Sequence, residues 1–257
     1  GDSLLASTFF GSSEYDQAYF VRTAQNNHVY IYGQTKAPDS TMIFNAEYNV
    51  PGAGMLIAHF APNLDQLVWS TVFGTPQGHP NLSPSAFATD VCNRIYAAGW
   101  GRDMVHSCVG DWNISGTTGM QVTADAIQST TDGEDFYIIS LNQDASAIEF
   151  ATFFGELHDD DYGYYHGRDH VDGGTSRFDK FSTLYQSVCA SCGGSDQFPT
   201  TAGVWSNTNP STNCNNAVFR LNVHNDYALA QCLQPHVGCY PPYTVRFDNT
   251  SRGTSYE

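Results

Sequence analysis

Basic side chains are scarce in this sequence. Lysine and arginine together number 10 against 26 aspartates and glutamates, and only Lys36 and Lys180 are lysines. The formal net charge of -16 argues against nucleic acid or an anionic membrane as a partner, because a polyanion would be repelled. Glutamate is scarce too, whereas Gly, Asn, Ser, Thr and Tyr are abundant, which suits short strands and turns better than long helices.

Long apolar runs are also missing. No stretch approaches the roughly 18 apolar residues that a membrane-spanning helix needs. The first residues, Gly1 to Ser3, have neither the charged nor the apolar region of a signal peptide. We therefore expect no membrane insertion, and a signal peptide, if one is made, to be already removed.

Motifs of common enzyme classes are absent as well. The sequence has no Gly-x-Ser-x-Gly elbow, no Gly-Lys-Ser/Thr phosphate loop and no complete Gly-x-Gly-x-x-Gly. These absences predict a protein that is not an enzyme and holds no organic cofactor. A catalytic triad assembled in space stays open, because His, Asp and Ser are common in the chain.

Cysteines, in contrast, are numerous: there are seven. With few lysines and many Tyr, Asn and Thr residues, they predict an extracellular or cell-surface protein, because disulfides persist in oxidising compartments. We expect at least one disulfide and, since the number is odd, at least one free thiol. The candidate disulfide cysteines are Cys189, Cys192, Cys232 and Cys239.

A short pattern recurs along the chain. It reads Ser7-Thr-Phe-Phe-Gly11, Ser70-Thr-Val-Phe-Gly74 and Ala151-Thr-Phe-Phe-Gly155, at intervals of 63 residues (74 minus 11) and 81 residues (155 minus 74). Recurrence of this kind indicates tandem structural units.

Strand patterns surround each copy. A hairpin signal precedes the second and third copies, and a further pair of strands follows every copy. Four strands in a unit of roughly 60 to 80 residues is the build of a propeller blade. The expected strands are 18–21, 29–33, 55–60, 67–69, 86–88, 95–99, 136–141, 148–150, 175–178, 184–188, 218–223 and, without a Phe-Gly ending, 229–232.

The predicted fold is all-β, with β-propeller-like repeats of four-stranded sheets and about three recognisable blades over residues 1–238. Propellers close with about 4 to 8 blades, so three blades leave two outer faces uncovered. The propeller is then incomplete, closes irregularly, or is closed by neighbouring chains. We expect the sequence to be a piece of a longer polypeptide.

The repeats resemble those of a known family. The Ser-Thr-Phe-Phe-Gly endings and the stretches VYIYGQT (29–35), RIYAAGWG (94–101) and QFPTTAGVWSNTNPSTNC (197–214) resemble the SBBP-type β-propeller repeats of large bacterial surface proteins. HVDGGTSRFDK (170–180) and VCASCGG (188–194) resemble secreted proteins with gliding-motility-associated C-terminal domains. The resemblance implies a secreted repeat protein and says little about function.

The end of the sequence resembles a different domain. Residues 243–257 resemble the opening strands of a PKD-type, immunoglobulin-like domain, and the paired prolines in 239–243 indicate a linker. We therefore expect a second region over residues 239–257. An unpaired strand there, such as Val245–Asn249, would be a template for pairing with another chain.

The stretch from Gly155 to Gly174 holds three histidines and five aspartates and falls on a connection between strands. It is interpreted as a solvated loop, a structural cation site with calcium as the expected ion, or a catalytic metal site. No Asp-x-Asp-x-Asp-Gly or His-Glu-x-x-His pattern is present. The candidate metal ligands are Asp159, Asp161, His170 and Asp172.

The Cys189-Ala-Ser-Cys192 pair has three interpretations: a redox pair, half of a zinc site, or a disulfide at a strand end. The disulfide is favoured, because no second such pair follows at zinc-ribbon spacing and no thioredoxin-like pattern surrounds this one.

Two further sets of residues are singled out. Most aromatic residues, Phe9 and Trp205 among them, are predicted to lie in the core between blades. Asn81, Asn113 and Asn249 match the N-glycosylation pattern, and Ser3 resembles a bacterial O-glycosylation site.

Together these features predict a non-catalytic extracellular module of a bacterial surface protein, connected with gliding motility and acting in adhesion or as a filament or fibril subunit. The expected partners are further copies, through head-to-tail or strand pairing, neighbouring domains of the same polypeptide, and glycans. The alternative is a glycan-binding or hydrolytic propeller with its site at the His/Asp-rich loop. A passive spacer between domains is a third hypothesis.

Overall fold

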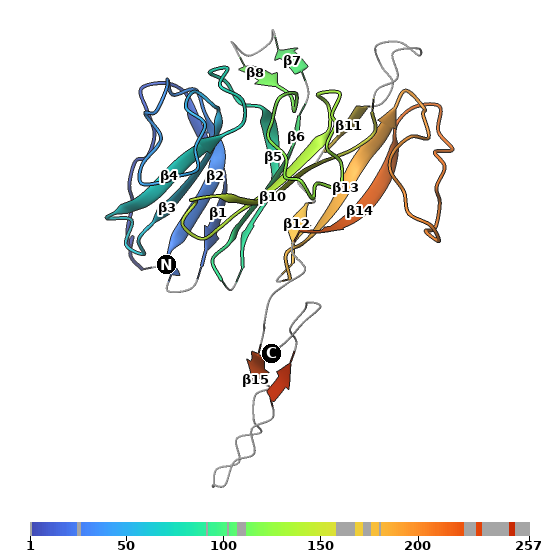
Figure 1. Cartoon of the computed structure of the whole chain (residues 1–257). Coiled ribbons are helices and arrows are strands. Elements are labelled where there is room, and N and C mark those ends of the chain that lie inside the picture. The colour runs from blue at the N-terminus through green and yellow to red at the C-terminus, as the bar shows by residue number, and fades with distance from the viewer. Residues whose placement is uncertain are drawn as a thin grey trace.

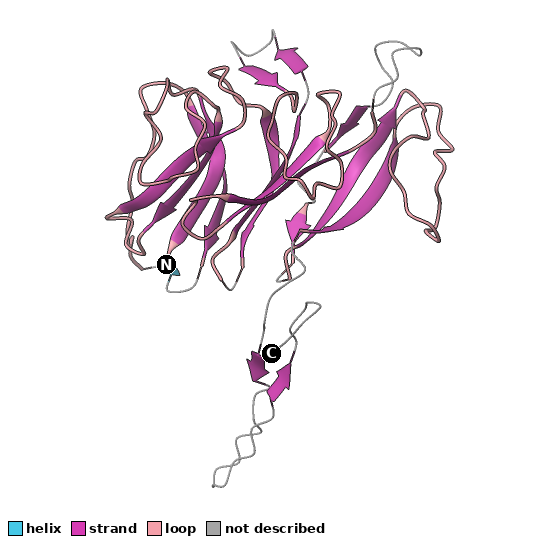
Figure 2. Ribbon diagram, viewed as in Figure 1, coloured by secondary structure: helices cyan, strands magenta, loops and turns pink. Residues whose placement is uncertain are grey.

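A computed structural model of the chain describes residues 2–24, 27–90, 92–101, 103–106, 112–157, 168–171, 176–179, 181–223, 230–232 and 247–249. Residues 103–106, 112–114, 168, 230–232 and 247–249 are described by their backbone alone. The described chain is all-β, and three antiparallel sheets of four strands stand side by side in chain order (Figures 1 and 2).

The first and second sheets have the same organisation. In each, four strands follow one another in sequence order across the sheet, and every neighbouring pair is antiparallel. The first sheet contains β1 (Asp16–Thr23), β2 (Val29–Thr35), β3 (Met55–Phe60) and β4 (Leu67–Phe73). The second sheet contains β5 (Leu82–Thr89), β6 (Ile95–Gly101), β9 (Phe136–Leu141) and β10 (Ile148–Phe154).

The third sheet departs from that plan. Two short strands, β11 (Arg168–His170) and β12 (Arg177–Phe178), share one side of the long strand β13 (Thr183–Cys192), and β14 (Asn215–Asn222) lies on its other side. The sheet therefore has four strands but only three positions across. The place that β4 and β10 occupy in the other sheets is taken by no described strand.

Two small hairpins complete the described strands. β7 (Asp103–His106) pairs with β8 (Trp112–Ser115), which the sequence reading did not predict. β15 (Ala230–Cys232) pairs with β16 (Phe247–Asn249). This pairing corrects the expectation that the strand near Val245–Asn249 is unpaired. It also joins residues on either side of the predicted boundary at 238/239, and the boundary itself lies outside the described residues.

Most of the apolar core lies between the sheets. The first and second sheets pack through buried side chains such as Tyr32, Ile57 and Phe73 on one side and Phe87 and Tyr137 on the other. The ring centroids of Tyr32 and Phe87 are 5.5 Å apart. All six residues of β3 are buried, which requires cover on both faces of the strand.

The second and third sheets pack in the same way through another set of buried residues. Phe136 and Ile138 of β9 meet Leu184, Phe219 and Leu221 of the third sheet. The rings of Phe136 and Phe219 are 5.5 Å apart. The second sheet is therefore sandwiched between its two neighbours.

Three long connections form what we call the edge loops: residues 36–54 between β2 and β3, 116–135 between β8 and β9, and 193–214 between β13 and β14. In the first edge loop, Phe44 exchanges two backbone hydrogen bonds with Ser70 of β4 (2.9 and 2.8 Å). In the second, Thr123 N–H donates to Ala151 O of β10, and Gln128 O accepts from Phe153 N–H, both at 3.0 Å. The first and second edge loops thus cover the outer edge of the fourth strand of their sheets.

The first edge loop also covers the outer face of the first sheet. Its Met42 and Ala53 pack on Leu56 and Val72, with Phe10 against the same cluster. This finding corrects the expectation that the chain leaves this face bare. Ring closure into a propeller is not observed among the described residues, whose first and third sheets lie on opposite sides of the second.

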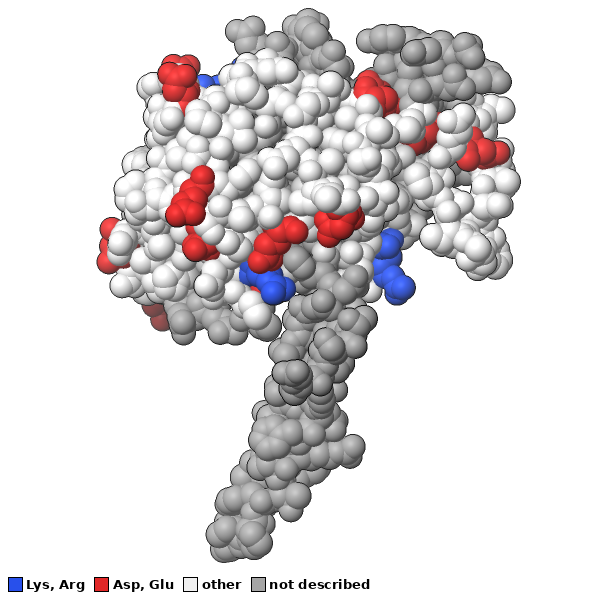
Figure 3. Space-filling view, in the orientation of Figure 1, with Lys and Arg blue, Asp and Glu red and all other residues white. Residues whose placement is uncertain are grey.

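Charged side chains are spread thinly over the face shown in Figure 3. Acidic residues stand apart from one another, and the few basic ones lie near the lower margin of the sheets and at the upper left in that view. This face therefore presents no basic surface for a polyanion.

Candidate functional site

The predicted metal loop is described only at its end. Asp159, Asp161 and Asp172 lie outside the described residues, so the calcium site stays a prediction. His170 is the last residue of β11 and is paired with Cys189 of β13. The structure thus places this histidine beside the Cys-x-x-Cys pair, which the sequence reading treated separately.

A local bend brings the two cysteines of the pair together. In a regular strand, residues three apart point to opposite faces of the sheet. Ser191, between Cys189 and Cys192, has a left-handed backbone with φ of 56°, and Gly193 follows with φ of 100°. A register shift opposite them pairs Arg168 with Cys192 and His170 with Cys189. This β-bulge accommodates the additional residue and redirects Cys192.

Three potential ligand atoms converge at this bend. Cys192 Sγ lies 3.8 Å from Cys189 Sγ and 3.8 Å from His170 Nδ1, and the ligand atoms of the three residues are all within 4.8 Å of one another. A disulfide has an S–S length of about 2.05 Å. The sulfurs of Cys189 and Cys192 are therefore neighbours that are not bonded to each other, and the disulfide proposed for them stays a prediction.

Cys214 approaches the same place from the third edge loop. It directly precedes β14, whose Asn216 is paired with Cys189. Its Sγ lies 3.6 Å from Asn213 Oδ1 and does not belong to the converging group of three ligand atoms. Gly194 makes this approach feasible, because a Cβ there would lie 2.8 Å from the Thr212 carbonyl group. Burial, with the neighbouring Cys214 and Cys189 thiols, raises the pKa of Cys192.

A buried carboxylate fixes the bend. Asp169, which precedes His170, accepts hydrogen bonds from the backbone N–H of Ser191 (3.0 Å) and of Glu156 (2.8 Å). Burial raises the pKa of Asp169 to about 8. Trp100 lies on the other side of His170, with the two rings 5.9 Å apart. The histidine and the Ser191 turn are therefore held by partners outside the cysteine cluster.

A second buried carboxylate lies at the end of the second edge loop, directly before β9. Asp135 accepts a hydrogen bond from Gln128 Nε2 at 3.1 Å, while its Oδ2 atom has no hydrogen-bond partner. Burial raises its pKa to about 7. Its ligand atoms do not form a converging group with other acids. Within the described ranges, His170, Cys189 and Cys192 are the one such group of three or more His, Cys, Asp or Glu side chains.

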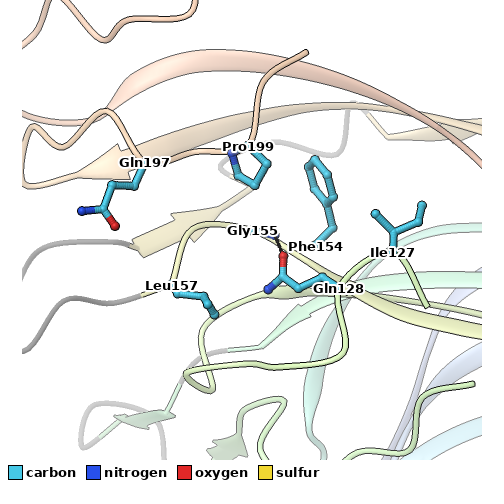
Figure 4. Close-up of a pocket in the computed structure, with 7 residues that line it drawn as sticks. All are labelled: Ile127, Gln128, Phe154, Gly155, Leu157, Gln197 and Pro199. Carbon is cyan, nitrogen blue, oxygen red and sulfur yellow. Dashed lines mark hydrogen bonds between the residues drawn. The ribbon is translucent and has the colours of Figure 1, made fainter. Parts of the chain in front are cut away.

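A hollow of about 400 Å³ lies between the second edge loop and the third edge loop (Figure 4). In it, Gln128 Oε1 accepts a hydrogen bond from Gly155 N–H at 3.1 Å. None of the described residues that line this hollow has an ionisable side chain or a hydroxyl, so they offer no nucleophile and no general base. Its lining residues are Ile127, Gln128, Phe154, Gly155, Leu157, Gln197 and Pro199.

The glycosylation candidates differ in accessibility. Ser3 is exposed. Asn81 is 0% exposed, and its amide bonds Thr75, Ser115 and Gly116. A glycan on Asn81 of the folded chain would have to break these bonds. The side chains of Asn113, Asn249 and Cys232, and all of Cys239, lie outside the described structure.

Two aromatic residues are far more exposed than predicted. Tyr30, Tyr32, Trp69, Phe73, Tyr96 and Phe153 are buried in the core as expected. Phe9, however, is 105% exposed, and Trp205 in the third edge loop is 103% exposed. The expectation of core positions for Phe9 and Trp205 is therefore wrong for the chain taken alone.

Comparisons with known proteins assign no family to these features. A scan against protein-family models gives no match, and a search of curated proteins gives none. Separately, no described helix has the length and apolar character needed to cross a membrane.

Proposed function

We propose that this chain is a non-catalytic, β-propeller-like structural module of an extracellular surface protein, and that its copies join head to tail by strand pairing. The observation that carries the proposal is a match between two incomplete parts. One is a segment with the sequence of a fourth strand that pairs with no described strand, although its Phe10 packs against the first sheet. The other is the third sheet, which has no described fourth strand.

The segment is Leu4–Phe10. It corresponds residue by residue to β4 (Leu67–Phe73) and β10 (Ile148–Phe154), and all three run into the recurring Phe-Gly ending. In β4 and β10 the residues matching Phe9 are Val72 and Phe153, which are 2% and 3% exposed. Phe9, Leu4 and Leu5 are exposed, and the segment forms no strand. Its sequence is thus suited to a position in a sheet that it does not occupy.

The third sheet supplies the matching edge. β14 pairs with β13 on one side, and no described strand pairs with its other side. An open strand edge offers backbone donors and acceptors to an incoming strand, and side-chain pockets then set the specificity. Phe219 and Leu221 of β14 are buried against the second sheet. One face of the strand that would pair with the incoming segment is therefore already packed in the core.

The third edge loop packs inward through Phe198 but covers no described fourth strand of its sheet. Most of its hydrogen bonds with described residues close the loop on itself, several of them through Asn209, which bonds Ser195 O and Asn213 O at 3.2 and 2.9 Å. Ser195 Oγ in addition donates to the Glu156 carboxylate outside the loop. Residues 199–208 are all exposed, Trp205 included. An incoming fourth strand would lie between β14 and this loop and bury both.

The donor segment Leu4–Phe10 of one copy would pair with the β14 edge of another copy. Such a contact joins two different surfaces of the molecule. Repeated contacts of that kind build open fibres unless the rotation closes a ring. This geometry supports the filament form of the proposal. The acidic composition, the many cysteines and the lack of enzyme motifs support an extracellular, non-catalytic role.

The test follows assembly as a function of concentration by light scattering and electron microscopy. The wild-type chain is expected to form filaments or open oligomers, and Phe9→Asp, which places a charge on an exposed side chain of the donor, is expected to remain monomeric. Val21→Asp is the matched control, because Val21 is also exposed and lies outside both surfaces. It should assemble like the wild type.

A synthetic peptide of residues 4–11 separates the two halves of the proposal. We expect it to bind the Phe9→Asp protein at one site and to block wild-type assembly. A monomeric wild type that binds the peptide would overturn self-assembly and leave the acceptor edge for another strand of a longer polypeptide. No assembly together with no peptide binding would overturn the proposal entirely.

A further inference from the structure

We propose that His170, Cys189, Cys192 and Cys214 form a structural zinc site of the Cys₃His type at the end of the third sheet. This inference goes beyond the proposed strand pairing and does not depend on it. The residues come from three separate parts of the chain: β11, the end of β13, and the third edge loop just before β14.

The spacing of the ligand atoms fits a tetrahedral zinc ion. Zinc binds thiolate sulfur at about 2.3 Å and imidazole nitrogen at about 2.0 to 2.1 Å. At a tetrahedral angle these lengths place two sulfurs about 3.8 Å apart and a sulfur and a nitrogen about 3.6 Å apart. The observed separations are 3.8 Å for Cys189 Sγ to Cys192 Sγ and 3.8 Å for Cys192 Sγ to His170 Nδ1. A zinc ion therefore fits among the three atoms with little side-chain movement.

The fourth ligand is Cys214. Its thiol lies outside the group of three converging atoms, 3.6 Å from Asn213 Oδ1, so it would have to rotate to reach the ion. The close passage of Gly194 against Thr212 places its segment beside the bend. Three thiolates and one imidazole are a common ligand set of structural zinc sites, which are closed to substrate. Soft sulfur ligands disfavour calcium and magnesium, which prefer oxygen.

The backbone is shaped for ligation. Ser191 adopts φ of 56° and is held there by the Asp169 carboxylate, and the glycines at 193 and 194 have φ of 100° and 86°. A Cys-x-x-Cys turn followed by two glycines places both sulfurs on one side. A disulfide within this pair would use two of the three converging ligand atoms.

Zinc would link β11 and the third edge loop to β13. These are the parts of the third sheet that have the fewest residues in strand pairing. β11 has three residues, and the third edge loop is largely exposed. Binding of a metal to the folded state alone adds its binding free energy to the stability of that state. The site thus ties β11 and the third edge loop to β13.

The experiment uses the full chain, reduced and freed of metal, and titrates it with Zn²⁺ alone. We expect one equivalent of tightly bound zinc by elemental analysis. Co²⁺ in its place should give the intense thiolate charge-transfer and visible bands of a tetrahedral site. Cys192→Ser and Cys214→Ser should each weaken zinc binding by ~100-fold or more.

Cys92→Ser is the matched control, because Cys92 is an exposed cysteine of the second sheet. It should bind zinc like the wild type. His170→Gln adds a variant that keeps all the sulfurs, and it should alter the Co²⁺ spectrum. Unchanged zinc affinity in Cys214→Ser would overturn the fourth ligand. A Cys189–Cys192 disulfide in protein taken directly from its native source, with no bound metal, would overturn the site.

Discussion

The same five-residue pattern has opposite surroundings in different parts of this chain. In the second and third copies, Val72 and Phe153 lie in strands with a sheet on one side and an edge loop on the other, and they are almost fully buried. In the first copy, the equivalent Phe9 is fully exposed. Local sequence is nearly identical, so the difference comes from the availability of a partner strand. A strand sequence alone does not make a strand, because its hydrogen bonds and its burial come from neighbours.

The sheets show the complementary difference. The first and second sheets end in a fourth strand covered by an edge loop, whereas the third ends at β14 with an exposed loop beyond it. Edges that are covered resist association, and edges that are open invite it. The comparison therefore predicts that the proposed association takes place at the third sheet, and four predictions test the comparison.

The largest difference is expected between Phe153→Ala and Phe9→Ala. Removal of the buried Phe153 ring leaves a cavity in the core between the first two sheets, which should lower the free energy of unfolding by about 3 to 5 kcal/mol. Phe9→Ala should change it by less than about 0.5 kcal/mol in the unassembled chain. Urea denaturation of both variants at low protein concentration measures this. Equal losses would mean that the two copies have equivalent environments after all.

A second contrast concerns the edge loops. Met42 of the first edge loop is buried against the first sheet, so Met42→Ala should lower the free energy of unfolding by about 2 to 3 kcal/mol. Trp205→Ala in the third edge loop should have almost no effect on the monomer and should weaken assembly. Thermal unfolding and light scattering give the two readouts. A large loss of monomer stability in Trp205→Ala would show that its loop is already packed.

The third prediction concerns pH and the buried Asp135, which bonds the second edge loop through Gln128. Burial raises its pKa from 3.8 to about 7, so the folded state holds a proton that the unfolded state releases. The stability that the protonated Asp135 contributes is fully present below a pH of about 4, and it is lost as the pH rises towards about 7. Asp169 adds a similar loss up to a pH of about 8.

In Asp135→Asn the side chain has no proton to lose, so stability should fall less steeply between these pH values than in the wild type. Denaturation midpoints measured from pH 4 to pH 8 compare the two slopes. A variant with the wild-type slope would assign the pH dependence to other groups.

The smallest effect is expected from a single hydroxyl. Ser70 Oγ donates a hydrogen bond to Met42 O at 2.8 Å, which links the recurring pattern to its edge loop. Ala151 in the next copy has no such group. Ser70→Ala should therefore cost about 1 kcal/mol of stability. A cost near zero would mean that the Ser70 hydroxyl does not help to hold the first edge loop, and that the backbone hydrogen bonds between Phe44 and Ser70 are sufficient.

Much of the fold follows from the sequence pattern. Met55–Phe60 and Phe136–Leu141 are strands with the predicted bounds, and the expected unit of four antiparallel strands is confirmed for the first and second sheets. The third unit was predicted less well, because β15, expected beside β14, pairs with β16. The β7–β8 hairpin was missed, since its residues lie in a glycine-rich stretch with no clear alternation.

The candidate site was predicted only in pieces. His170 was assigned to an acidic loop, and the Cys-x-x-Cys pair was considered apart from it. Only the register of β11 on β13 shows that His170 lies opposite Cys189, 19 residues further along (189 minus 170). Cys214 has no neighbouring motif at all. A signal was present in the glycines after Cys192, which indicate a turn at the strand end.

By itself, the sequence determined the strands, their recurrence and the all-β class, because alternation of side chains and turn residues act over a few neighbouring positions. The tertiary structure decided which edges are covered, which copy of the pattern is buried, and which histidine meets which cysteines. These outcomes depend on contacts between distant segments. Their free energy comes from burial and pairing across the chain, and no local pattern contains that information.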